Sequence, residues 1–200
     1  MKNKHIFTTL FLALIFSIST AYAQLEVPRA SPSASVSQVA GFTKIDIDYS
    51  SPGVKGRKIF GELVPYGTTW RAGANAATAV TFSNGVSIGD KNLRAGTYNL
   101  FITPVEGGEW TVHFNGEGKS VFSYMKDGGI DEAALAADDV ASITVAPNKT
   151  AELVERLRFM ISPTDNTEAH ISMEWENVSL TFPVNVRTEA MINQIQETLK

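Results

Sequence analysis

The chain has 200 residues, with 17 Lys and Arg against 21 Asp and Glu and a formal net charge of −4. This length fits one domain, and the negative charge argues against binding to nucleic-acid backbones or to anionic membranes. The absence of cysteine excludes disulfides, thiol nucleophiles and Cys-based metal sites.

Residues 1–23 are predicted to be a secretory signal peptide. Lys2 and Lys4 precede an apolar run over residues 6–18, and Ala21-Tyr22-Ala23 has the small-x-small pattern of a cleavage site. The run is too short to span a membrane, and no cysteine follows it to carry a lipid. We therefore expect an exported protein, periplasmic or extracellular, without a stable membrane anchor. Cleavage would remove two lysines and take the net charge from −4 to −6.

A flexible lead-in is expected at residues 24–33, followed by a β-rich domain at residues 34–187. Alternating apolar and polar residues predict strands at 42–50, 78–83, 86–88, 97–103, 110–115, 140–145, 157–162, 170–175 and 178–186. Asn84-Gly85 predicts a two-residue hairpin, and Gly107-Gly108 predicts a second tight connection. Short strands at this spacing indicate an all-β fold, an antiparallel β-sandwich that is jelly-roll-like or immunoglobulin-like.

Two helices are predicted. One is short and Ala-rich, at residues 130–137. The other is a C-terminal helix at residues 188–200, which Thr188 can cap and which places Met191, Ile195 and Leu199 on one side. That apolar side is expected to pack on the sandwich or on a partner.

The segment from Asp48 to Asn75, DYSSPGVKGRKIFGELVPYGTTWRAGAN, follows neither the strand period nor the helix period. It holds five Gly, two Pro, four aromatic residues and four cationic residues. A long non-periodic loop in a compact domain is usually functional or strongly structured for its own reasons. This segment is therefore the first place to look for a site.

A ligand-binding site is predicted on this loop, because arginine forks suit carboxylates or phosphates and aromatic rings offer stacking faces. The candidate residues are Arg57, Lys58, Tyr66, Trp70, Arg71 and Asn75. A purely structural interpretation is also open. In that interpretation the apolar residues of the loop, Trp70 among them, plug one end of the sandwich. The two arginines then pair with Asp46, Asp48 or Glu62.

An enzymatic alternative rests on the histidines and carboxylates outside the loop. His113 and His170 both fall on the polar faces of their predicted strands, so solvent-exposed histidines are the simpler interpretation. If those strands were neighbours, the two histidines and Glu174 could hold a metal. Asp46 and Asp48 share a strand face about 7 Å apart, as carboxylates on any alternating strand would.

Three motifs resemble one family. They are SPxAxVSQ at residues 31–38, DYSxPxVKGRKIFGxLVPYGxxWRxGAN at residues 48–75, and LxAGTYxLFxxP followed by EWTVxFN at residues 93–115. They are similar to the family catalogued as domain of unknown function 2911, found in exported bacterial proteins. The resemblance implies an exported β-rich domain with no assigned activity, and it transfers no catalytic residues. From Asn115 the chain reads NGEGKSVFSYMKDGG, where the family leads us to expect an aromatic Trp-Gly step.

The sequence therefore favours a non-enzymatic exported binding or structural module. Its partner would be a small anionic or saccharide-like ligand, or another protein, and neither nucleic acid nor a cofactor is expected. The alternative is a hydrolase-like enzyme that uses carboxylates or a His-based metal site.

Overall fold

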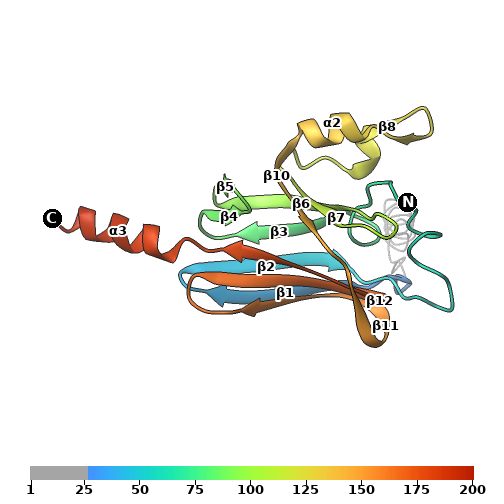
Figure 1. Ribbon diagram of the computed structural model, residues 1–200, viewed down its shortest axis with the longest axis horizontal. Helices are drawn as coiled ribbons and strands as arrows, with labels where there is room; N and C mark the ends of the chain where they lie inside the picture. Colours follow the sequence, from blue (N-terminus) through green and yellow to red (C-terminus); the bar gives the residue numbers. More distant parts are fainter. Residues whose placement is uncertain (1–26) are drawn as a thin grey trace, which may run out of the picture.

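The computed structural model describes residues 27–200 (Figure 1). The predicted signal peptide and residues 24–26 lie outside the described residues. The described chain forms two facing antiparallel sheets and a small two-stranded sheet. This arrangement confirms the predicted antiparallel β-sandwich with a C-terminal helix, and it is not a closed barrel.

The first sheet has six strands in the order β1-β2-β3-β6-β7-β10. Their bounds are β1 Ser33–Ala40, β2 Thr43–Ser50, β3 Thr78–Phe82, β6 Gly96–Thr103, β7 Trp110–Asn115 and β10 Asp139–Val145. The second sheet has four strands in the order β11-β12-β4-β5. Their bounds are β4 Val86–Ile88, β5 Lys91–Leu93, β11 Asn148–Pro163 and β12 Glu168–Asn185.

The core lies between the inner faces of the two sheets. Successive side chains of a strand point to opposite faces, so alternate residues of each strand are buried together. The first sheet contributes Ile45, Ile47, Val80, Phe82, Leu100, Ile102, Val112 and Phe114, and β12 contributes Ile171, Met173, Trp175, Leu180, Phe182 and Val184. The alternation predicted for residues 42–50, 110–115 and 178–186 is confirmed by this burial.

An insertion between β7 and β10, residues 116–138, covers the outward face of β6 and β7 (Figure 1). It contains the 3-10 helix η1 (Val121–Tyr124), the hairpin β8 (Met125–Lys126) and β9 (Gly129–Ile130), and the helix α2 (Glu132–Ala137). Phe101 of β6 forms a second small core with Val121, Tyr124 and Leu135 of this insertion. The prediction that His113 is solvent-exposed is therefore wrong, because the insertion buries the outward face of its strand.

The predicted Asn84-Gly85 hairpin is also wrong. The residues on either side of it belong to different sheets, β3 to the first and β4 to the second. Neither Asn84 nor Gly85 has the positive φ that a two-residue hairpin of this type needs. Asn84 instead donates a hydrogen bond to the carbonyl of Phe42 at 2.7 Å, which fixes the crossing between the sheets. The tight hairpin lies one strand later, between β4 and β5, with Gly89 at φ 56.

The strands predicted separately at 170–175 and 178–186 form one strand, β12. Its partner β11 is longer than predicted, and the register between the two shifts after Lys149 and again after Val154. In the shifted part β11 leaves β12 and turns to the loop that follows β2. Val54 donates to the carbonyl of Glu155 at 2.7 Å, and Gly53 bridges to Arg156.

The C-terminal helix α3 (Thr188–Thr198) extends away from one end of the sandwich (Figure 1). The prediction that Thr188 caps it is wrong: Arg187 occupies the cap position, and the Thr188 hydroxyl donates to the carbonyl of Asn166. Ile192, Ile195 and Leu199 are exposed, so this helix does not pack on the sandwich. Between residues 27 and 200, no helix is both long and apolar enough to cross a membrane.

Candidate functional site

Residues 51–77 connect β2 to β3 without a regular strand or helix, as the sequence predicts. Hydrogen bonds to both sheets nevertheless hold this loop in place. The backbone of Ile59 donates to the Glu176 side chain of β12 at 3.1 Å. Trp70 and Ile102 of β6 exchange two backbone hydrogen bonds of 2.8 Å each. The loop is therefore a fixed part of the fold, and its side chains have defined directions.

Trp70 belongs to an aromatic cluster at the end of the sandwich. Its ring stacks on Trp175, with centroids 5.7 Å apart and an interplanar angle of 23°, and meets Phe60 edge-on at 6.2 Å. Its indole N–H donates to the carbonyl of Gly73 at 2.9 Å. Such pairs stabilise a fold beyond their buried area. The structural interpretation of the loop thus describes Trp70 well.

Arg71 is directed toward the insertion rather than into this cluster. Its guanidinium carbon lies 5.1 Å from the centroid of the Phe122 ring. Its Nε is buried and has no hydrogen-bond partner within residues 27–200. No acid of the described chain pairs with it, and burial lowers the pKa of the guanidinium. A half-buried cation without an anionic partner destabilises the fold unless a bound ligand supplies the anion.

A cavity of about 230 Å³ lies between the loop and the insertion. Apolar groups dominate its wall, and Arg71 is the one charged residue there. The residues that line it are Leu63, Val64, Pro65, Thr68, Thr69, Trp70, Arg71, Val121, Phe122, Met125, Gly128, Gly129 and Ile130. Leu63, Phe122 and Met125 are about half exposed, which is unusual for large apolar side chains gathered in one place.

The other four predicted site residues lie elsewhere. Arg57 donates to the carbonyls of Val54 at 3.0 Å and Gly53 at 2.6 Å, and exposed Lys58 lies 3.9 Å from Glu62. Tyr66 is 36% exposed. Asn75 donates to Ser31 and Ser50 beside a different cavity and so anchors the end of the lead-in. Of the six residues, the structure brings Trp70 and Arg71 together at one cavity.

The residues of the proposed metal site are not neighbours. His113 lies on the first sheet, whereas His170 and Glu174 lie on the second. The ring of His113 bonds to Thr103 at 2.8 Å and to Asp139 at 2.6 Å, while His170 bonds to Thr164 at 2.9 Å. Throughout residues 27–200, no group of three or more His, Asp or Glu is placed to hold a metal ion. Of the two strand carboxylates, Asp46 pairs with Lys44 at 2.7 Å.

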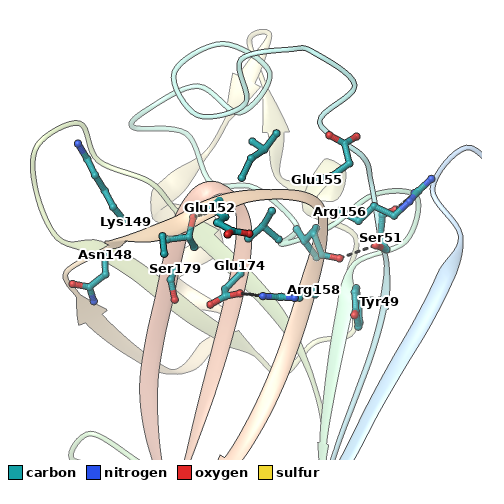
Figure 2. Close-up of a pocket in the computed structure, with 15 residues that line it drawn as sticks. Tyr49, Ser51, Asn148, Lys149, Glu152, Glu155, Arg156, Arg158, Glu174 and Ser179 are labelled. Atoms are coloured by element: carbon teal, nitrogen blue, oxygen red, sulfur yellow. Dashed lines mark hydrogen bonds and ion pairs between the residues drawn. The ribbon is translucent and has the colours of Figure 1, made fainter.

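A larger open groove, of about 1000 Å³, runs along the shifted part of β11 (Figure 2). Its two arginines are already engaged within the protein. Arg158 donates two hydrogen bonds to Glu174, at 2.9 and 2.6 Å, and Arg156 donates to the carbonyl of Ser51 at 3.0 Å. Figure 2 shows the Lys149 and Glu155 side chains pointing away from the Arg158–Glu174 pair. Its arginines are therefore already satisfied and do not need an anionic ligand.

Sequence reasoning missed the second wall of the cavity. Thr69 lies in the segment from Asp48 to Asn75, but its residue type gives no sign that it lines a cavity. Phe122 and Met125 lie in the segment NGEGKSVFSYMKDGG, which has no strand or helix period. No local pattern could show that this segment folds back over β6 and β7.

Comparison with known proteins identifies a family but no characterised relative. The family model described as "Protein of unknown function (DUF2911)" matches residues 31–184. The match covers the loop, the insertion and nearly all of both sheets, and it ends at Val184, one residue before the end of β12. No curated protein and no solved structure matches the chain.

Proposed function

The chain belongs to the family described as protein of unknown function DUF2911, and we propose that it is a non-enzymatic binding module. Its ligand would be a small carboxylate with an apolar body, held in the cavity at Trp70 and Arg71. The observation that carries this proposal is the Arg71 guanidinium, half-buried beside apolar walls and without an acid partner in the described chain.

The chemistry of the cavity selects the ligand class. A planar guanidinium binds a carboxylate through two parallel hydrogen bonds, and such charge-assisted bonds strengthen where water is excluded. The Trp70 and Phe122 rings suit a flat or branched apolar group. Because binding sites for drug-sized molecules are about 300–1,000 Å³, a cavity of about 230 Å³ fits a smaller ligand, such as a one-ring acid. A saccharide would need more polar partners than these walls supply.

Calorimetric titration with benzoate tests the proposal. Benzamide, which has nearly the same shape without the charge, is the matched ligand control. Arg71→Met should weaken benzoate binding about 10–100-fold, because a hydrogen bond to a charged group contributes about 1.5–3 kcal/mol. Lys58→Met is the matched protein control, since it removes an exposed cation from the same loop. Equal binding of benzoate and benzamide, or equal weakening by the two substitutions, would contradict the proposal.

Export is part of the proposal and rests on the signal-peptide pattern of residues 1–23. N-terminal sequencing of the protein recovered outside the cytoplasm should begin at Gln24. Recovery of the intact chain from the cytoplasm alone would contradict export without affecting the binding proposal.

A further inference from the structure

A continuous hydrogen-bonded chain of five polar side chains runs beneath the insertion. It links Glu132 of α2, Thr69 of the loop, Thr103 of β6, His113 of β7 and Asp139 of β10. Thr69 bonds through its hydroxyl to one oxygen of Glu132 and through its backbone N–H to the other, at 2.9 Å. The two threonine hydroxyls lie 2.5 Å apart. Thr103 lies 2.8 Å from His113 Nε2, and His113 Nδ1 lies 2.6 Å from Asp139.

The number of protons in this chain is informative. Four side-chain hydrogen bonds join the five groups, and each bond needs one proton. With both carboxylates ionised and the imidazole neutral, only three protons are present, one on each hydroxyl and one on the ring. One bond would then place two acceptors face to face. All four hydrogen bonds form when the five side chains together hold one additional proton.

His113 can hold that proton and keep both of its hydrogen bonds, because an imidazolium has a donor on each ring nitrogen. The imidazolium then donates at Nδ1 to Asp139 and at Nε2 to Thr103. Thr103 donates to Thr69, and Thr69 donates to Glu132. The surroundings favour this state. The His113 and Asp139 side chains are 11% and 8% exposed, and Asp139 Oδ1 has no hydrogen-bond partner within the described residues. A buried carboxylate in this position is stabilised by a cation beside it.

Other titratable groups near these five side chains have partners of their own. Asp138 accepts hydrogen bonds from Lys119 at 2.7 Å and from Tyr124 at 2.9 Å. Arg71 lies over Phe122, two residues along the loop from Thr69. On β6 and β10, the residues paired with His113 are Phe101 and Ser142, which carry no charge. The charges that face His113 are therefore those of Asp139, directly, and of Glu132, through the two threonines.

We infer that these five residues form a proton relay that stores one proton and carries it between His113 and the wall of the cavity. In the transfer, Nε2 gives its proton to Thr103, Thr103 gives its own to Thr69, and Thr69 gives its own to Glu132. Each hydroxyl keeps one proton, and all four hydrogen bonds remain. The negative charge of Glu132, which bonds to the cavity residue Thr69, is thereby cancelled. This last step rests on the proposed function: an anion bound to Arg71 favours the relay with its proton on Glu132.

Nitrogen NMR of the histidine rings tests the relay in the exported chain, from which residues 1–23 have been removed. His170 is the internal reference, because the remaining chain has only these two histidines. The spectra are recorded at about pH 8, where a free imidazole is neutral. His113 should carry protons on both ring nitrogens. A neutral His113 under these conditions would overturn the relay.

Glu132→Gln is the decisive variant, because its amide supplies the missing proton covalently. The Gln amide N–H donates to Thr69, so every bond forms with His113 neutral, and the Nε2 proton should be lost. Glu109→Gln removes an exposed carboxylate outside the relay and should leave His113 doubly protonated. If Glu132→Gln does not fold, Thr69→Ser should keep the imidazolium and Thr69→Val should lose it. A doubly protonated His113 in Glu132→Gln or in Thr69→Val would overturn the relay.

Titration with benzoate tests separately whether an anion bound at Arg71 moves the proton from His113 to Glu132, which we call the coupling. Saturation should convert His113 to the neutral ring with its proton on Nδ1. If benzoate binds and the imidazolium persists, the coupling is wrong and the relay stands. If benzoate does not bind, the proposed function is wrong, and the unliganded spectra still decide the relay.

Discussion

Replacement of Arg71 by Met should leave the fold as stable as before or stabilise it. The substitution removes the contact with the Phe122 ring, which contributes about 0.5–1 kcal/mol at an exposed site. It also removes a buried Nε without a partner in the described chain, and leaving such a donor unsatisfied costs about 1–3 kcal/mol. The methionine chain keeps the packing against the cavity wall. We expect the free energy of unfolding to change by between zero and about 2 kcal/mol, in the stabilising direction.

Urea unfolding followed by tryptophan fluorescence measures this change. Trp70→Phe, one residue away, is the comparison, because it removes the hydrogen bond to the buried Gly73 carbonyl and part of the stack on Trp175. It should destabilise the fold by about 2–4 kcal/mol. If Arg71→Met instead destabilised the fold by more than about 1 kcal/mol, Arg71 would be a structural residue, and the basis of the binding proposal would be lost.

Three further predictions test the fold around the site. Leu135→Ala should destabilise the protein by about 2–4 kcal/mol and increase hydrogen exchange across the insertion, because Leu135 is fully buried in the second core. Hydrogen bonds from Lys119 and Tyr124 lower the pKa of Asp138, so its contribution to stability is complete above the ordinary aspartate pKa and is lost as the pH falls through the lowered value. The melting temperature of Asp138→Asn should therefore fall less than that of the wild type between about pH 5 and about pH 2. Ile195→Glu should leave the melting temperature unchanged, since this face of α3 is exposed.

Strands with one apolar face and one polar face could be predicted from the sequence. Alternation of apolar and polar residues located β2 and gave the bounds of β7 as Trp110–Asn115. The same local reasoning failed at Asn84-Gly85, where the chain crosses to the other sheet. The hairpin propensity of Asn-Gly concerns the local turn alone. Whether the next strand pairs in the same sheet or crosses to the other depends on the rest of the fold.

Burial of the outward face of β6 and β7 could not be predicted in this way. His113 alternates with inward apolar residues and so has the pattern of an exposed strand residue. It is buried because residues 116–138, which follow no period, fold over it. The second core and the relay both depend on that distant cover, which no window of sequence around His113 contains.

The candidate site was predictable in its residue types and not in its shape. Cationic and aromatic side chains directed attention to the loop, and two of the six predicted residues line the cavity together. Trp70 and Arg71 are adjacent, yet one packs in the aromatic cluster and the other meets Phe122. The loop is therefore a structural element on one side and a candidate site on the other, and the ligand-binding interpretation stays a prediction.

The most direct test of the binding proposal is a crystal structure of the chain grown with benzoate. We expect the carboxylate on the Arg71 guanidinium, including a hydrogen bond from Nε, and the ring against Trp70 and Phe122. An empty cavity with Arg71 paired to an acid of the chain itself, or benzoate bound elsewhere, would contradict the account.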